Sequence, residues 1–390
     1  MKNRLGNSVS VTLFGESHGE AIGAVLDGLA PGIEVDEAYI ARSLSLRRPA
    51  GKISTKRVEP DHFRILSGVY GGRTTGTPLC IVIPNENAKS EDYKDARFLA
   101  RPGHADYTAH CKYHGFEDPR GGGHFSGRIT AALVAAGAVV IPALMRKGIR
   151  IGTHIAQCGG ISDRRFSASP EELQDEIEAL SQSSFAALDP AAADRMRAAM
   201  EQAAEDGDSV GGVLETIVTG VPAGVGEPWF DSLESVLSHA LFSIPAVKGV
   251  SFGDGFAMPL MRGSEANDCF AMRGGRVVTR TNHNGGINGG ISNGMPILFQ
   301  CAVKPTPSIF KEQDTVDFSK GTEEKLVICG RHDPAIVHRA RIVADSVCAL
   351  VLCDMLAQRY GTDWLAMPCC ADREGDGCND TGSGHFLSDP

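Results

Sequence analysis

The feature that most constrains the fold is a long apolar stretch between Ser126 and Arg146. Nearly every residue from Ala131 to Met145 is apolar, so a helix here is hydrophobic on every side and has to be buried. The stretch is too short to span a bilayer, and Pro142 interrupts it. A chain of 390 residues can surround such a helix with a large core. Because Ser126 is a suitable N-cap, we predict a helix from Ser126 toward Arg146 in the middle of the fold.

Strand patterns occur in pairs between the other predicted helices. Residues 8–14 and 21–26 alternate apolar and polar side chains and predict a hairpin. Further strands are predicted at 63–70, 78–84, 210–221, near 250 and at 297–303, and helices at 36–47, 232–242, 334–359 and twice within 169–200. Paired strands favour an α+β fold with antiparallel sheet. We expect one domain over residues 1–365 and a flexible tail over 366–390.

The charge and the cysteines restrict the partners and the compartment. The chain has 38 Lys and Arg against 48 Asp and Glu, a formal net charge of −10, which disfavours nucleic acid and anionic membranes as partners. Its 11 cysteines include no C-x-x-C pair and often lie in apolar runs, as is typical of reduced thiols. The N-terminus contains no secretory signal. We therefore expect a cytoplasmic protein that acts on a small molecule.

Candidate chemistry is concentrated in four glycine-rich polar loops. They are GESHG at 15–19, RPGHAD at 101–106, RGGGHFSGR at 120–128 and GRHDP at 330–334. Such loops combine backbone freedom with titratable groups. Arginines in or beside them provide planar forks that suit carboxylates and phosphates. A further glycine-rich stretch, 285–296, precedes Lys304 and is a candidate phosphate nest.

Other motif assignments fit less well. GESHG matches the nucleophile elbow of serine hydrolases, but a strand follows it where a helix is required. Residues 122–128 approach a P-loop, except that Arg128 and Ile129 replace the Lys and the Ser or Thr. No strand-linked G-x-G-x-x-G and no local set of zinc ligands are present. The acidic segment 372–383 has EF-hand-like spacing without the terminal Glu. We expect no metal.

Taken in order, the motifs resemble those of the chorismate synthase family. They are GESHG, RRP, SGV, TTGTP, RPGHADY, RGGG-x-x-S-x-R, I-x-A-V-K-G, GGIS-x-GMPI, KPTPS and GRHDP, over about residues 1–360. The resemblance implies a β-α-β sandwich of two antiparallel sheets around central helices, assembled as a homotetramer. It also implies anti-1,4-elimination of phosphate from 5-enolpyruvylshikimate 3-phosphate to give chorismate, dependent on reduced FMN. An anion-binding protein that has lost catalysis is the alternative, and use of NADPH by the chain itself is left open.

The resemblance also implies roles for individual residues. His18 resembles the acid for the departing phosphate, His104 the histidine that protonates reduced flavin, and Asp333 the carboxylate that acts with flavin N5. The implied proton-relaying hydroxyls are Ser17 and Ser126, and the implied substrate ligands are Arg48, Lys52, Arg101 and Arg128. The implied flavin contacts are His124, Phe125, Ser126, Ala246, Gly289, Lys304, Pro305, Thr306, Pro307, Ser308 and Arg331. His124–Phe125 stands where many members have Arg–Ser, and Ile129 replaces a frequent Glu.

Overall fold

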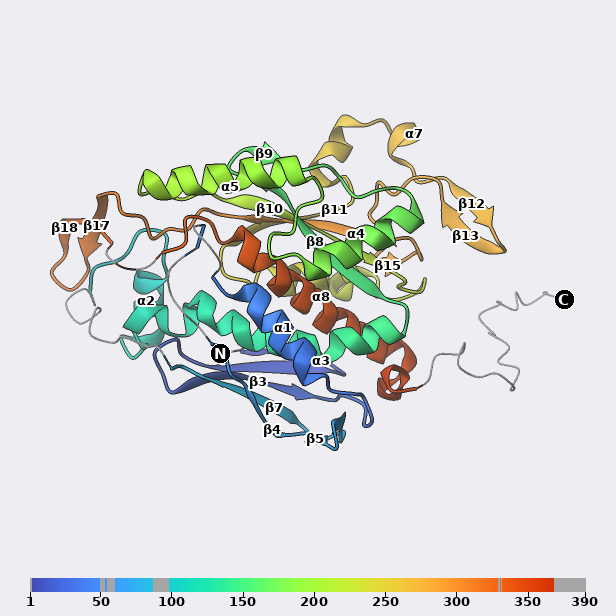
Figure 1. Ribbon diagram of the computed structural model, residues 1–390, viewed down its shortest axis with the longest axis horizontal. Helices are drawn as coiled ribbons and strands as arrows, with labels where there is room; N and C mark the ends of the chain where they lie inside the picture. Colours follow the sequence, from blue (N-terminus) through green and yellow to red (C-terminus); the bar gives the residue numbers. More distant parts are fainter. Residues whose placement is uncertain are drawn as a thin grey trace.

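The computed structural model describes residues 2–49, 53–54, 60–86, 98–328, 330 and 332–367. Within them the chain forms two five-stranded sheets with helices packed between them (Figure 1). This is the mixed α+β arrangement with antiparallel strands that the paired strand patterns predict. Lys52, Arg331 and residues 368–390 of the predicted tail lie outside the described residues.

The first sheet contains the predicted N-terminal hairpin. Strand β2 (Ser10–Gly15) pairs antiparallel with β3 (Ala21–Asp27), and the strand order is β1-β2-β3-β7-β4. The other strands are β1 (Arg4–Leu5), β7 (Leu79–Pro84) and β4 (Arg64–Ser67), with β5 (Val69–Tyr70) and β6 (Arg73–Thr74) forming a small separate ribbon. Phe14 lies opposite Gly23. A side chain at Gly23 would meet the Phe14 ring at 2.3 Å, so this register needs glycine.

The second sheet has the order β11-β16-β10-β8-β9. Its strands are β11 (Val247–Phe252), β16 (Ile297–Val303), β10 (Gly212–Thr219), β8 (Arg150–Cys158) and β9 (Ile161–Ser162). The sequence pattern does not reveal β8, because its polar residues Thr153 and His154 are fully buried rather than exposed. The Thr153 hydroxyl lies 2.7 Å from that of Thr216 on the neighbouring strand, so burial leaves it satisfied.

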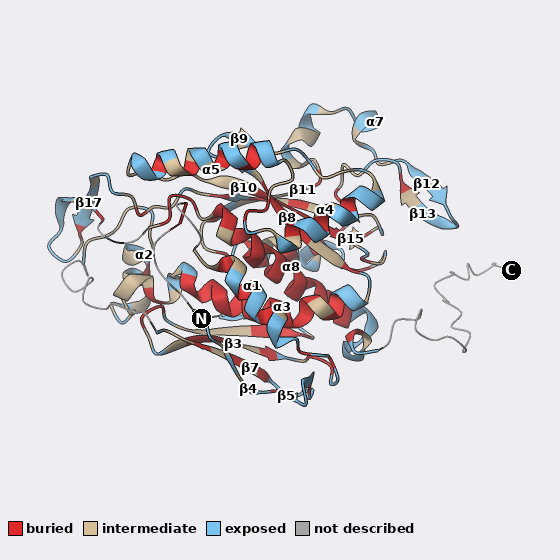
Figure 2. Cartoon of the chain, in the orientation of Figure 1, coloured by how far each residue is buried: buried red, intermediate tan, exposed pale blue. Residues whose placement is uncertain are grey.

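Helices α1 (Glu37–Arg47), α3 (Thr130–Arg146) and α8 (Val337–Tyr360) lie between the sheets. Helix α3 packs against β3 and β7 of the first sheet, while α8 packs against β8 and β10 of the second. Both are buried along most of their length (Figure 2). Helix α1 packs on both of them and begins, as predicted, at Asp36, whose carboxylate accepts from the Tyr39 amide. Gly137 allows close approach of α3 and α8, since a Cβ there would lie 2.4 Å from Ser346 Cβ.

The central apolar helix begins in a slightly different way from the prediction. The Ser126 hydroxyl accepts from the Arg128 amide at 3.2 Å and caps the 3-10 turn η3 (Gly127–Ile129), which leads into α3. In the part of the chain that the structure describes, one helical stretch, Gly127–Arg146, has the length and hydropathy of a membrane span, but 89% of its apolar window is buried inside the protein. It is a core helix.

The remaining elements cover the sheets and extend from the two ends of the molecule. Helices α4 (Pro170–Gln182) and α5 (Pro190–Glu205) pack on the second sheet. Helix α2 (Asp106–Tyr113) and the hairpin β17 (Gln313–Asp317) with β18 (Thr322–Leu326) lie at one end (Figure 1). At the opposite end are α7 (Gly263–Ala266) and the hairpin β12 (Phe270–Arg273) with β13 (Arg276–Thr279). The short elements are η2 (Arg120–Phe125), η4 (Trp229–Asp231), α6 (Leu233–Leu241), η5 (Gly255–Leu260), β14 (Ile287–Asn288), β15 (Ile291–Ser292) and η6 (Thr362–Leu365).

Candidate active site

A cavity of about 890 Å³ lies where the predicted loops converge. Its wall includes residues of the RPGHAD loop, of η2 and η3, of the start of α8 and of the connection between α6 and β11. Apolar side chains such as Leu13, Leu133 and Val343 form part of the wall, and arginines form another part. The volume is in the range of ligand pockets, and the mixture of apolar wall and convergent polar groups is typical of them.

Two buried arginines of the wall share one carboxylate. Arg47 and Arg128 line the cavity, and their guanidinium groups pair with the two oxygens of Asp61. Arg48 stands behind them with its Nε 3.9 Å from the same carboxylate, and this Nε has no hydrogen-bond partner among the described residues. The structure thus brings the predicted Arg128 to the cavity, does not bring Arg48 to its wall, and adds Arg47. The signal for Arg47 was its position beside Arg48 at the end of the predicted helix.

Arg101 and Asp106 close the RPGHAD loop on itself. The Arg101 side chain donates two hydrogen bonds of 2.8 and 2.7 Å to Asp106, which also accepts from the Arg101 amide. Burial alone would raise the pKa of Asp106, but the hydrogen bonds from Arg101 outweigh it, so the pKa lies below its usual value. Arg101 lines the cavity. Its ion pair with Asp106 fixes the loop residues between them.

His104 joins this loop to the KPTPS segment. Its Nε2 lies 2.7 Å from the Ser308 hydroxyl, and Lys304 Nζ donates to the Gly103 carbonyl at 2.7 Å. Burial, followed by the charge of neighbouring cations, lowers the pKa of His104 to about 4. The imidazole is therefore neutral near pH 7 in the ligand-free protein.

The backbone beside Lys304 is strained. The Lys304 amide donates to the carbonyl of Ala246, a cavity residue that has φ +74°, a conformation rare for any residue with a Cβ. The register of β11 shifts directly after it, between Val247 and Gly249. The Thr306 hydroxyl is buried without a hydrogen-bond partner among the described residues. The strained residue Ala246 and the unsatisfied Thr306 hydroxyl both belong to the set of residues predicted to contact flavin.

Ser17 and His18 lie beneath the glycine turn of η2 rather than on the cavity wall. The Ser17 hydroxyl is 3.0 Å from His18 Nδ1, and the Ser17 amide donates to the Gly123 carbonyl. Gly121 and Gly122 of the same turn do line the cavity. A Cβ on Gly121 would lie 2.0 Å from His18 Cε1, so the glycine turn packs directly on the imidazole.

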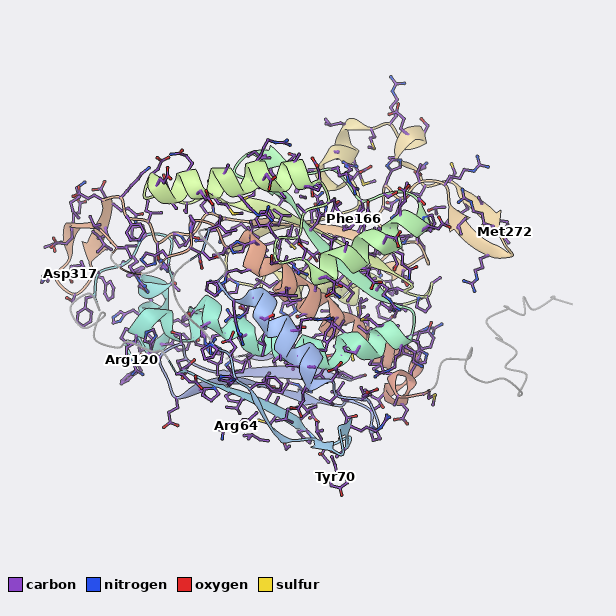
Figure 3. The ribbon with its side chains drawn as sticks, viewed as in Figure 1. Arg64, Tyr70, Arg120, Phe166, Met272 and Asp317 are labelled. Carbon is purple, nitrogen blue, oxygen red and sulfur yellow. The ribbon has the colours of Figure 1, made fainter. Side chains whose placement is uncertain are left out.

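The rest of η2 is anchored at both ends. His124 Nδ1 lies 2.7 Å from the Gly15 carbonyl, and Phe125 packs edge-on to Tyr113 of α2. Arg120, labelled beside α2 in Figure 3, donates two hydrogen bonds of 2.8 Å to Asp118 and so holds the pKa of that carboxyl below its usual value. His124, Phe125 and Ser126, three of the predicted flavin contacts, all line the cavity.

The GRHDP loop reaches the cavity through Asp333. Its carboxylate accepts from Arg339 of α8, and Arg339 Nε donates to the Arg47 carbonyl at 2.7 Å. Arg339 lines the cavity although the sequence motifs do not include it. Its position six residues after Asp333, at the start of a buried helix, is a signal that could have indicated it.

Comparisons with known proteins identify the family of this chain. A sequence model of the family described as chorismate synthase matches residues 9–357. The chain belongs to the chorismate synthase family. A chorismate synthase from Aeropyrum pernix is 46% identical over 358 residues, 92% of this chain and 93% of that protein. One from Dehalococcoides mccartyi is 45% identical over 362 residues, 93% of this chain and 98% of that protein.

The fold also agrees with a solved chorismate synthase. A crystal structure of chorismate synthase has a TM-score of 0.73 at 29% identity and covers 91% of this chain and 94% of that one. Chorismate synthase is a lyase, so the chain is an enzyme of that class. Some residues of the family's motifs do not line the cavity of this chain. Gly289 lies exposed on the turn between β14 and β15, and Figure 1 shows β15 far from α2.

The stretch 285–296 therefore does not form a phosphate nest at this cavity, because none of its residues lines it. Of the KPTPS segment, Lys304 and Pro307 line the cavity, whereas Pro305, Thr306 and Ser308 lie behind them. The predicted contacts Lys52 and Arg331 are outside the described residues. Within the described part of the chain, no group of three or more His, Cys, Asp or Glu side chains is arranged to hold a metal ion.

Proposed function

We propose that this lyase performs anti-1,4-elimination of phosphate from 5-enolpyruvylshikimate 3-phosphate, giving chorismate, with reduced FMN as cofactor. The observation that supports this most is the meeting of buried arginines, the His104–Ser308 pair and the Asp333–Arg339 pair at one cavity. An elimination of phosphate needs cationic groups for the leaving anion, which the arginines supply, and a positioned acid, a role that we assign to His18.

The substrate would be held by the arginine-rich part of the wall. It carries a phosphate and two carboxylates, and guanidinium forks recognise both groups. We assign this role to Arg101 and Arg128 and, from the resemblance to the family, to Arg48 and Lys52 as well. Arg128 is only 6% exposed, and a cation in such a water-poor site stabilises a departing phosphate more strongly than one in solvent.

The residues around Ala246 and Lys304 fit a flavin. The strained Ala246 backbone and the apolar wall offer a close approach of main chain and a surface for a ring. The Thr306 hydroxyl, behind Lys304 and Pro307, is an unsatisfied hydrogen-bonding group next to this wall. Ser308, Pro305, Pro307, Arg331 and residues 124–126 complete this proposed contact set, and we assign Gly289 to the flavin site of a neighbouring subunit. When bound, reduced FMN supplies electron density to the allylic centre.

The protons would be handled by two histidines in different surroundings. His18, supported by Ser17 beneath a single glycine turn, would donate to the departing phosphate. His104, whose Nε2 is held by Ser308, would exchange a proton with the cofactor, with Ser126 as a relay and Asp333 fixed by Arg339. Its pKa of about 4 belongs to the ligand-free protein, and an anionic ligand in the cavity raises it.

We also propose a homotetramer, acting on a small molecule in the cytoplasm. Several large apolar side chains are exposed, and Figure 3 shows one of them, Met272, at the end of the hairpin β12–β13. They are Trp229, Phe230, Phe256, Leu260, Phe270 and Met272. So much exposed apolar surface is characteristic of a subunit interface.

The test is an anaerobic assay with photoreduced FMN that follows both phosphate release and chorismate formation. Stoichiometric release of the two products is expected. Repeating the assay with oxidised FMN and NADPH alone shows whether the chain reduces its own flavin. A protein that binds FMN and substrate but releases no phosphate would instead be the anion-binding alternative.

A further inference from the structure

Asp61 is a fully buried carboxylate between the arginines of the cavity wall. Its side chain has 0% exposure, and those of Arg47 and Arg128 have 4% and 5%. Oδ2 accepts from Arg47 at 3.1 Å, and Oδ1 accepts from Arg128. Asp61 does not line the cavity, whereas both arginines do. A buried carboxylate of this kind fixes where the guanidinium groups lie without itself meeting the ligand.

The two arginines come from parts of the fold that are otherwise separate. Arg47 ends α1, and its carbonyl accepts from Arg339. Arg128 lies in η3, and its Nε donates to Asn85, just after β7, at 3.1 Å. Asp61 therefore connects the helix layer to the end of the first sheet at the point where both face the cavity.

The backbone at Asp61 has an unusual conformation at this connection. Its φ is +50°, in the left-handed region that residues with a Cβ rarely occupy. The preceding carbonyl, that of Pro60, accepts from Arg48. Such conformations persist where the surrounding structure requires them, and they concentrate at functional sites.

We propose that Asp61 is a positioning residue that orients Arg47 and Arg128 for the phosphate and carboxylate groups of the substrate. The inference rests on the proposed function for the nature of that substrate. Asp61 is an anion, so its charge opposes the binding of an anionic ligand. It favours the reaction only because it orients the guanidinium groups of Arg47 and Arg128. Its removal therefore has opposite effects on binding of a simple anion and on turnover.

The experiment compares Asp61→Asn and Asp61→Glu with the unaltered enzyme. Titration calorimetry of the ligand-free proteins with inorganic phosphate should show Asp61→Asn binding as tightly as the unaltered enzyme or more tightly, since one negative charge has left the site. Its kcat per folded molecule should fall on the order of 100-fold, the usual effect of about 1 Å of misplacement. Asp61→Glu keeps the charge and should lose less, about 10-fold.

Asp345→Asn is the matched control, because Asp345 is a buried carboxylate that pairs with Arg341 away from the cavity. It should lower thermal stability and leave kcat within about twofold of normal. For folded Asp61→Asn, a kcat within about twofold of normal, or a loss of phosphate affinity as large as the loss of kcat, overturns the proposal. If that variant does not fold, a normal kcat in Asp61→Glu overturns it.

Failure of the proposed function has a different signature. In that case the unaltered enzyme forms no chorismate, and the role of Asp61 is decided by crystal structures of the ligand-free variants. These should show the Arg47 and Arg128 guanidinium groups displaced in Asp61→Asn relative to the unaltered protein. Unmoved guanidinium groups overturn the proposal whatever the reaction is.

Discussion

His104 Nε2 and the Ser308 hydroxyl lie 2.7 Å apart although 204 positions separate them in the sequence. The contact ties the RPGHAD loop to the KPTPS segment, and Lys304 reinforces it by donating to the Gly103 carbonyl. His104 is thereby oriented from one side by a hydroxyl and kept neutral by burial and nearby cations. Two motifs that are separate in sequence thus form one functional unit.

The first prediction concerns the pH dependence of stability. The pKa of His104 is lowered from 6.5 to about 4 in the folded protein, so the unfolded chain binds this proton first as the pH falls. The contribution of the neutral His104 to the free energy of unfolding is fully present above about pH 6.5 and is lost as the pH falls toward 4. His104→Gln should remove up to about 3 kcal/mol of this pH dependence. Urea unfolding of both proteins from pH 7 to 4.5 measures it, and parallel stability curves would contradict the prediction.

The second prediction uses the glycine turn above His18. Gly121→Ala places a Cβ 2.0 Å from the imidazole, whereas at Gly122 the nearest atom is 3.8 Å away. Both positions have positive φ, so each alanine costs about 1–2 kcal/mol of backbone strain. Only Gly121→Ala should also displace His18 and lower kcat, by about 10²-fold or more. Steady-state kinetics with thermal melting of both variants checks this, and equal kcat values in the two would show that His18 is not used.

The third prediction concerns flavin binding. Lys304→Ala removes a cation from the proposed flavin wall together with its hydrogen bond to Gly103, so FMN affinity should fall by about 10- to 100-fold, corresponding to 1.5–3 kcal/mol. Lys311 is a suitable control, because it pairs with Asp208 on the surface. Flavin fluorescence titration, with and without substrate, gives the dissociation constants. Equal affinities for Lys304→Ala and Lys311→Ala would remove Lys304 from the flavin site.

The fourth prediction concerns Arg48, which lies behind the two arginines of the cavity wall. Arg48→Ala should raise the KM for the substrate sharply, since its Nε is unsatisfied beside Asp61. Arg48→Lys should recover the KM only in part, because a point charge does not replace a bidentate fork. Arg42 of the same helix, which stacks over Tyr39, provides the control. A KM for Arg48→Ala that matches that of Arg42→Ala would mean that Arg48 does not contact substrate.

Most helices and strands follow from local sequence patterns. The hairpin of β2 and β3, the capped helix α1 and strand β16 are recognisable because side-chain periodicity and capping depend on residues a few positions apart. The sequence patterns miss helix α2 and the hairpins β12–β13 and β17–β18. They also miss β8, where the alternation is hidden because His154 is buried and paired with Asp163 and Glu215 from distant segments. From the sequence alone, a polar residue that is buried beside its partners cannot be distinguished from one that is exposed to solvent.

The sequence by itself determined the buried central helix, the paired strands, the family and the loops that carry the polar residues. Only the tertiary structure decided which of these residues meet. Arg47 and Arg339 reach the cavity although the resemblance implies no role for them, Gly289 lies far from it, and His18 packs beneath a glycine turn instead of on the wall. The physical reason is that a motif fixes only its own backbone, whereas the approach of its side chains to those of another motif depends on how the two sheets and the helices between them pack together.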